Sequence, residues 1–212
     1  MKENLVTENI QFSYNKDHTF LFPDIVCEKG EHLLITGSSG CGKTTLLHLI
    51  AGLLKPSSGC ISINNRDITK LKNKDLDKHR GREIGIVFQS PHFIKSLTAK
   101  ENLAIAPSIN HLTVDQLYIG NLFEKLNISH CINSKVNEMS QGELQRLSIA
   151  RAVVNRPSLI LADEPTSSLD DKNCEEAVKL LCCQADELKA SLVIVTHDNR
   201  LTSRFSKSIQ LK

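Results

Sequence analysis

The chain lacks the features that mark membrane-spanning and secreted proteins. No apolar run approaches the roughly 20 residues that a helix needs to cross a bilayer. The opening segment MKENLVTENIQF lacks the apolar core of a secretory signal. We therefore expect a cytoplasmic protein with no direct membrane insertion, whose membrane role, if it has one, comes through a partner.

Paired cysteines and a charge excess are also missing. The seven cysteines include no Cys-x-x-Cys pair and no Cys/His cluster at the spacing of a zinc site, so we expect reduced thiols. A net charge of +2 is too small to indicate nucleic acid or anionic lipid as the main partner, and no nucleic-acid partner is expected. With 40% apolar and 24% charged residues, the 212-residue chain has the composition of an ordinary globular domain.

What the chain does contain is an alternation of apolar strands and helices. Strands are expected at 6–12 and 32–36 and in CISIN, IGIVF, SLILADEP and SLVIVTHD; helices are expected at 142–155 and about 173–189. The charged stretch TKLKNKDLDKHRGRE is interpreted as a solvated helix or loop. Such alternation favours a mostly parallel sheet that places Thr36, Asp163 and His197 at one edge.

From residue 98 to about 131 the pattern changes to polar helices. TAKENLAIA and TVDQLYIGNLFEKL are separated by Pro107, which we expect to split them into two helices. Few strand signals occur there, so we interpret this region as an inserted helical lobe.

The segment GSSGCGKT fits the phosphate-loop pattern G-x-x-x-x-G-K-[ST], with Gly37, Gly42, Lys43 and Thr44 at the fixed places. In such a loop, backbone amides and a helix N-terminus face phosphate oxygens, the lysine faces the outer phosphates, and the Thr hydroxyl binds Mg²⁺. A plain glycine-rich turn is the alternative, and the expected strand before and helix after the loop argue against it.

The strand LILADE supplies a second half of such a site. Asp163 would lie at the sheet edge and hold the Mg²⁺ shell, while Glu164 would orient or deprotonate the water that attacks the γ-phosphate. Two acidic residues at the end of a strand often form only a solvated cap, and that is the alternative here. Their occurrence together with the phosphate loop favours the metal-binding and catalytic roles.

Two further polar residues end strands at the same edge. His197 would contact the γ-phosphate and fix the water with Glu164, and Gln89 would place its amide oxygen near the metal and the water. A single His is more often structural, and a Gln at a strand end has no meaning by itself. The proposed roles of His197 and Gln89 therefore depend on the neighbouring motifs.

With these residues in place, the chain resembles the ATP-binding cassette (ABC) ATPases, the nucleotide-binding subunits of ABC transporters. The resemblance covers nearly the whole chain: Tyr14, GSSGCGKTT, FQ, MSQGE, LILADEP, SSLD and VTHD occur in the family's order. It implies an α/β fold, with a P-loop NTPase core and mostly parallel sheet, an antiparallel β subdomain and an inserted α-helical subdomain. Within the single domain 1–212, the RecA-like core and β subdomain would comprise 1–97 and 157–212, and the helical subdomain would comprise 98–156.

The resemblance implies a role for each motif residue. Tyr14 would stack on adenine, the alternative being a core tyrosine; Glu164, His197, Gln89 and Lys43 would be catalytic. The remaining roles are nucleotide binding by Gly37, Ser38, Ser39, Gly40, Cys41, Gly42, Lys43, Thr44 and Thr45, Mg²⁺ binding by Thr44, Gln89 and Asp163, and a D-loop at Ser168, Leu169 and Asp170.

In the family, the signature acts on the nucleotide of a second subunit, so the resemblance implies a homodimer that sandwiches ATP. The signature here comprises Ser140, Gln141, Gly142 and Glu143 and departs from Leu-Ser-Gly-Gly-Gln. A backbone open to ordinary residues is expected at Gln141, because a required positive φ would strain it. Glu143 suits the helix dipole but lies near phosphate, so a modest loss of ATP affinity is expected.

The segments KHRGREIGIVFQ and LTAKENLAI resemble the group that includes lipoprotein-release, macrolide-export and cell-division ATPases, although SPHFIKS differs from that group. The resemblance implies an ATP-hydrolysing subunit, peripheral on the inner face of the cell membrane, that drives a separate membrane permease. A non-transport regulatory ABC ATPase of the cell-division type is the alternative. The cargo, the direction of transport and the permease are not encoded in these motifs.

Overall fold

Five parallel strands form the sheet that carries the phosphate loop. The computed structural model describes residues 2–15, 18–167 and 170–211. The strand order is β10 (Lys207–Gln210), β4 (His32–Thr36), β9 (Ser191–Thr196), β8 (Leu159–Asp163) and β7 (Ile84–Val87). Thr36 pairs with Thr196 and Asp163 pairs with Val195. The register confirms that Thr36, Asp163 and His197 share one edge.

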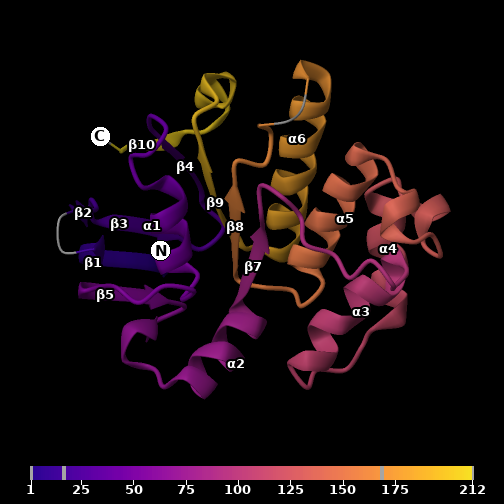
Figure 1. Cartoon of the computed structure of the whole chain (residues 1–212), viewed down its shortest axis with the longest axis horizontal. Coiled ribbons are helices and arrows are strands. Elements are labelled where there is room, and N and C mark those ends of the chain that lie inside the picture. Colours follow the sequence, from indigo (N-terminus) through magenta and orange to yellow (C-terminus); the bar gives the residue numbers. More distant parts are fainter. Residues whose placement is uncertain (1, 16–17, 168–169, 212) are drawn as a thin grey trace.

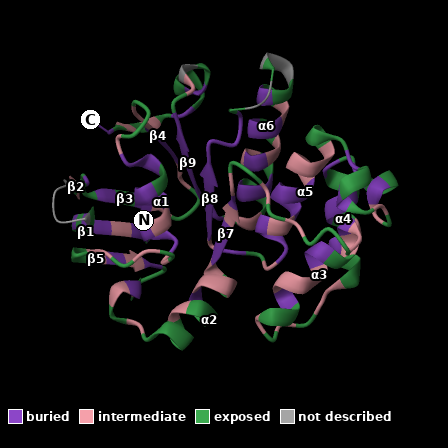
Figure 2. Cartoon of the chain, viewed as in Figure 1, coloured by how far each residue is buried: buried purple, intermediate pink, exposed green. Residues whose placement is uncertain are grey.

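Both faces of this sheet are covered, which is why its strands are apolar almost throughout. Every residue of β8 and β9 is buried, and Figure 2 shows these strands as the buried centre of the molecule. Leu33 and Ile35 pack with α1 (Lys43–Ile50), whereas Leu34 packs with residues of α5 (Gln141–Val153) and α6 (Asp171–Leu188). Alternate residues of one strand therefore hold helices on opposite sides.

A second sheet is antiparallel, as the resemblance implies. Its order is β2 (His18–Leu21), β1 (Glu3–Asn15), β5 (Ser58–Ile63) and β6 (Arg66–Asp67), and β3 (Ile25–Glu28) also pairs with β1. Leu5 and Ile61 of this sheet share a hydrophobic cluster with Leu46 of α1 and Leu161 of β8. The two sheets thus enclose one core around the helix that follows the phosphate loop (Figure 1).

The remaining helices lie in the expected regions. The stretch interpreted as a solvated helix or loop forms α2 (Asn73–Glu83), and the range 98–156 proposed for the helical subdomain contains α3 (Ala99–Ile109), α4 (Gln116–Lys125) and all of α5. Short 3-10 turns span Ile68–Lys70, Ser129–Cys131, Val136–Glu138 and Asn199–Arg204. The proposed limits of the subdomains stay a prediction.

Pro107 does not separate two helices, and the expected split at that residue is wrong. It lies in the last turn of α3, which continues to Ile109. A proline near a helix end removes only one hydrogen bond, and the helix is held by its Thr98–Glu101 capping box and by buried Leu103. The chain breaks instead at 110–115, where Asp115 accepts a hydrogen bond from the Tyr118 amide and caps α4.

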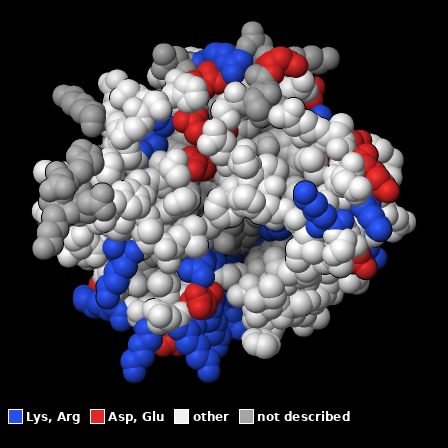
Figure 3. Space-filling view, viewed as in Figure 1, with Lys and Arg blue, Asp and Glu red and all other residues white. Residues whose placement is uncertain are grey.

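Charge is unevenly spread over the face seen in Figure 3. Lys and Arg gather at its lower edge, over α2, a helix that also contains Asp75, Asp77 and Glu83. Among the residues that the structure describes, none of the helices combines the length and apolar character that crossing a membrane requires. All seven cysteines are free thiols in the structure.

Candidate nucleotide site

The phosphate loop runs from the end of β4 into α1, and two of its glycines are sterically required. Gly42 caps α1 with φ 96°, and a Cβ there would lie 2.8 Å from the Phe20 ring. At Gly37 a Cβ would approach the Cys41 Sγ to 2.6 Å and the Leu211 carbonyl oxygen to 2.9 Å. The left-handed backbone disfavours a side chain at Gly42, and the close approaches disfavour one at both positions.

Lys43 places its ammonium group across this loop. The side chain is only 7% exposed, and Nζ donates to the carbonyl oxygens of Gly37 and Ser38, each at 2.9 Å. Nζ also lies 3.7 Å from Glu164 Oε1. A buried cation is thus held among oxygen atoms beside loop amides that suit phosphate.

Thr44 and Asp163 meet at the strand edge. The Thr44 hydroxyl donates to Asp163 Oδ1 at 3.1 Å. Burial raises the pKa of Asp163, and the hydrogen bond from Thr44 opposes that rise. Hard oxygen donors of this kind fit Mg²⁺, so the two residues present are compatible with the expected metal.

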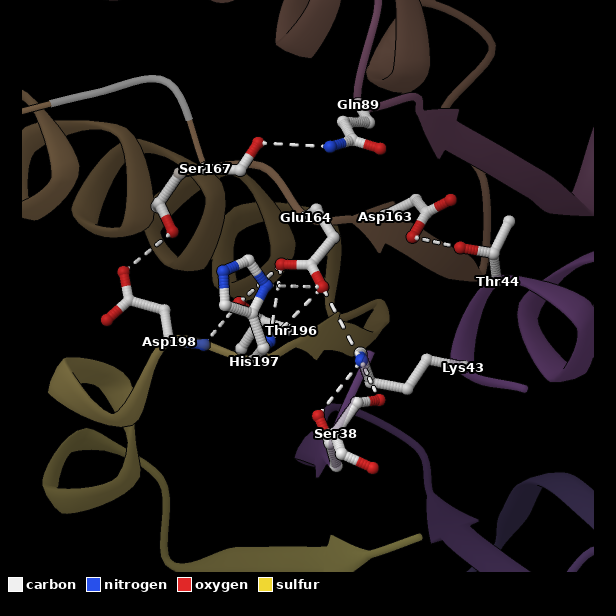
Figure 4. Close-up of polar contacts among 12 residues, drawn as sticks. Ser38, Lys43, Thr44, Gln89, Asp163, Glu164, Ser167, Thr196, His197 and Asp198 are labelled. Carbon is white, nitrogen blue, oxygen red and sulfur yellow. Dashed lines mark hydrogen bonds and ion pairs between the residues drawn. The ribbon is translucent and has the colours of Figure 1, made fainter. Parts of the chain in front are cut away.

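Glu164 is held by several hydrogen bonds at this edge (Figure 4). Its Oε2 accepts from the Thr196 hydroxyl at 2.8 Å, and the His197 backbone amide lies 3.2 Å from both carboxylate oxygens. The His197 ring Nδ1 lies 2.9 Å from Oε1. Glu164 has a φ of 44°, a left-handed backbone that strains a non-glycine residue and often accompanies function.

Gln89 extends from the end of β7 toward the same space. Its amide Nε2 donates to the Ser167 hydroxyl at 3.4 Å. Together with Lys43, Thr44, Glu164 and His197 it lines a cavity of about 410 Å³; the other lining residues are Phe20, Ser39, Gly40, Gly42 and Thr45. The structure therefore brings Lys43, Thr44, Gln89, Glu164 and His197 to one cavity, and Asp163 is connected to them through its hydrogen bond with Thr44. The predicted nucleotide-binding residues Gly37, Ser38 and Cys41 are not among the lining residues.

Tyr14 lies on β1 beside the loop helix. It is 59% exposed, and its hydroxyl lies 3.1 Å from the Thr45 Oγ1. Its ring packs edge-on against Phe12 at a centroid distance of 4.7 Å. The exposure excludes the alternative of a core tyrosine and leaves ring surface for a ligand.

Several residues of the site were not predicted from the sequence. Phe20 lines the cavity from β2, and Thr196 fixes Glu164. Asp198 accepts from the Thr166 hydroxyl at 3.2 Å, and its hydrogen bonds with Arg200 lower its pKa to about 2. Thr196 and Asp198 both belong to the quoted VTHD motif, which was the available signal.

The signature residues lie outside this cavity, at the start of α5. Ser140 caps the helix by accepting from the Glu143 amide, and the Glu143 carboxylate accepts from the Ser140 amide and hydroxyl, both at 2.7 Å. Hydrogen bonds from Ser140 and His130 lower the pKa of Glu143 to about 2. Ser140, Gly142 and Glu143 line a separate cavity of about 570 Å³.

Gln141 has the ordinary backbone that was expected. It is the first residue of α5 and is not among the residues with positive φ. The predicted D-loop residues Ser168 and Leu169 lie outside the described residues. Asp170 caps α6 by accepting from the Asn173 amide at 2.9 Å.

Comparison with known proteins agrees with this geometry. The family model described as ABC transporter matches residues 23–167. The lipoprotein-releasing system ATP-binding protein LolD of Colwellia psychrerythraea is 40% identical over 190 residues, covering 89% of this chain and 74% of that protein. The bacitracin export ATP-binding protein BceA of Halalkalibacterium halodurans is 37% identical, covering 98% of this chain and 85% of that protein.

A solved structure has the same fold. The dimeric ATP-binding cassette MJ0796, in a post-hydrolysis state bound to ADP and Pi, is 31% identical with a TM-score of 0.88, over 98% of this chain and 94% of that chain. Its fold agrees with the two sheets and the helices described above, and the phosphate loop, the paired acids and the signature helix occupy one continuous family match. The chain belongs to the ABC transporter family, as one of its ATP-binding subunits.

Proposed function

We propose that this subunit hydrolyses MgATP in a dimer of two copies and thereby drives a membrane permease. The observation that carries the proposal is the position of Glu164. Its carboxylate is held by Thr196 and His197 and lies 3.7 Å from the Lys43 ammonium group at the mouth of the phosphate loop. A carboxylate fixed in this way is suited to orient water for attack on a terminal phosphate.

Other residues of the site would bind the nucleotide and the metal. Loop amides and Lys43 would hold the phosphates, and Tyr14 would stack on adenine. Thr44, Asp163 and Gln89 would hold Mg²⁺, which when bound neutralises charge on the phosphates. Because Lys43 and Glu164 are both buried, their electrostatic effects are weakly screened by salt.

The signature residues support the two-copy arrangement. Ser140 and the N-terminus of α5 suit an anion, yet they line a different cavity from the phosphate loop. The ATP-binding cassette MJ0796 was solved as a dimer with ADP and Pi. We infer that each signature acts on the nucleotide of the other copy and releases it after hydrolysis.

The partner is proposed to be a permease embedded in the membrane. LolD and BceA are named for lipoprotein release and for bacitracin export. These relatives favour a transport subunit over the regulatory alternative, and a permease partner would hold the protein at the inner face of the membrane. Co-purification of the chain with a membrane protein is the direct test of this part.

Substitution Glu164→Gln tests the catalytic proposal. The amide keeps the size of the side chain but removes the base, so we expect ATP binding to persist, hydrolysis to fall by at least about a hundredfold, and a dimer to accumulate with MgATP. Nucleotide titration, phosphate release and size-exclusion chromatography measure the three outcomes.

Glu187→Gln is a matched control, because Glu187 pairs with Lys125 on the surface and should not affect turnover. A Glu164→Gln protein that hydrolyses ATP at the unchanged rate would refute the role of Glu164. A protein that stays monomeric with MgATP would refute the sandwich.

A further inference from the structure

A second group of chemically reactive side chains lies beside the signature. His130 Nε2, Cys131 Sγ and a Glu143 carboxylate oxygen all lie within 4.8 Å of one another. His130 and Cys131 belong to the 3-10 turn Ser129–Cys131, and Glu143 belongs to the first turn of α5. Imidazole, thiol and carboxylate from two segments therefore converge on one point.

We propose that His130, Cys131 and Glu143 form a binding site for one zinc ion beside the signature segment. The proposal goes beyond the ATPase function, and the site itself does not depend on that function. Thiolate, imidazole and carboxylate together suit Zn²⁺, and three protein ligands with water in the fourth position are a familiar zinc arrangement. A thiolate does not suit Mg²⁺ or Ca²⁺.

Two of the three ligands are held in place before any ion binds. Cys131 is only 4% exposed; its amide donates to the Ile128 carbonyl oxygen, and its carbonyl accepts from the Ser134 amide, both at 2.9 Å. Glu143 is fixed through Oε2 by the Ser140 amide and hydroxyl. That leaves Oε1 to face His130, whose Nε2 lies 2.6 Å away.

The third ligand can make the necessary adjustment. Zinc–ligand bonds of about 2.0–2.3 Å put tetrahedral ligands roughly 3.5 Å apart, so the ligand atoms must shift by roughly 1 Å. The His130 side chain is 67% exposed, so its ring has room to turn once the ion replaces its contact with Glu143, and the site is open to solvent. On binding, the Cys131 thiol would lose its proton to solvent and the ion would take its place.

The same carboxylate would then serve two partners. The ion would bind Oε1 of Glu143, while Oε2 keeps the hydrogen bonds from Ser140 that cap α5. An exposed His–Glu ion pair alone is a weak interaction and requires no buried thiol. The presence of Cys131 at the same point is what distinguishes a metal site from such a pair.

Cobalt binding to the purified full chain tests the proposal under reducing conditions. Co²⁺ replaces Zn²⁺ at thiolate sites and gives a thiolate-to-metal absorption band in the near ultraviolet. We expect one equivalent of Co²⁺ per chain and loss of the band when Zn²⁺ is added. His130→Gln and Cys131→Ala should each weaken binding by about tenfold or more.

Two control variants match these changes. His111→Gln and Cys183→Ser alter an exposed histidine and an exposed cysteine outside the cluster and should leave the titration unchanged. His130→Gln changes an exposed side chain and should fold, which circular dichroism checks, so the test does not depend on the buried Cys131. A band that survives His130→Gln and Cys131→Ala, a band lost in Cys183→Ser, or no band at all would overturn the proposal.

Discussion

Glu164 receives its hydrogen bonds from the strand next to its own. Thr196 and His197 follow each other at the end of β9, and both contact the carboxylate. Thr196 is fully buried, and its Oγ1 also accepts from the Asp198 amide at 3.0 Å. One hydroxyl therefore links the proposed catalytic acid to the segment that carries His197.

Substitution Thr196→Val removes this hydroxyl at nearly constant size. We expect turnover to fall by about tenfold with ATP affinity unchanged, because Glu164 loses a hydrogen bond that orients it. The free energy of unfolding should also fall by about 1–3 kcal/mol, since the buried Glu164 carboxylate and the partly buried Asp198 amide each lose a partner. Steady-state kinetics that separate kcat from KM, and urea unfolding, measure both effects.

Thr7→Val provides the comparison. Thr7 is a fully buried threonine of β1 that accepts a hydrogen bond from the Ile25 amide at 3.0 Å and is not among the residues that line the nucleotide cavity. The Thr7→Val protein should have a lower free energy of unfolding but an unchanged rate of ATP hydrolysis. Equal effects of the two variants on kcat would show that Thr196 is only structural.

The backbone of the phosphate loop was predictable from a local signal, while the roles of its residues stay a prediction. Gly37, Gly42, Lys43 and Thr44 follow a fixed spacing, and the structure gives the loop the required backbone. Phe20 and Cys131 were not predicted, because nothing near them in the sequence indicates a ligand. Phe20 reaches the cavity through the pairing of β2 with β1, and Cys131 meets Glu143 only after the lobe has folded.

At the scale of elements, the N-terminus of α5 depends on one ionised side chain. Glu143 takes part in the capping box with Ser140 and in the ion pair with His130. Its pKa of about 2 lies below the ordinary value of 4.5. A group whose pKa is lowered on folding stabilises the folded state above its unfolded pKa, and that stabilisation is lost as the pH falls toward its folded pKa.

We therefore expect the stability difference between the unmodified chain and Glu143→Gln to depend on pH. The difference should be largest above pH 4.5 and should shrink between pH 4.5 and about 2, where Glu143 becomes protonated. Thermal unfolding across this range measures it. Glu124→Gln, on the exposed side of α4, should give no comparable trend; a Glu143→Gln difference that grows on acidification would contradict the assigned ion pair.

Element boundaries were predictable where apolar runs end at polar residues. The range 32–36 matches β4, and 142–155 nearly matches α5. Pro107 misled the prediction, because its place in the last turn of α3 depends on where the helix starts and what it packs against. The charged α2 was ambiguous, since it buries only His79 within its length and so has little apolar periodicity.

At the scale of the whole molecule, the phosphate loop and the signature do not meet within one copy of the chain. The phosphate loop and Glu164 line one cavity, and the signature lines another. If each of these two parts completes the other in a second copy, a defect in one part can be complemented by a chain defective in the other part. This is a property that a site complete within one chain cannot have.

Mixing Lys43→Ala with Ser140→Arg chains tests this complementation. Each variant alone should be inactive, and in an equal mixture half of the dimers are mixed, each with one intact site of two. We expect roughly a quarter of the unmodified ATPase rate, measured as phosphate release. A mixture as inactive as its components would contradict action between copies; a second Lys43→Ala preparation in place of Ser140→Arg is the negative control.

The last described strand has a practical consequence for work with this protein. The Leu211 amide donates to the Thr36 carbonyl oxygen at 2.8 Å, and the Leu211 carbonyl oxygen would lie 2.9 Å from a Cβ at Gly37. The backbone after β10 thus forms part of the wall behind the phosphate loop. A change in the path of the backbone at Leu211 would therefore reach the first glycine of that loop, so labels and purification handles are better placed away from this strand.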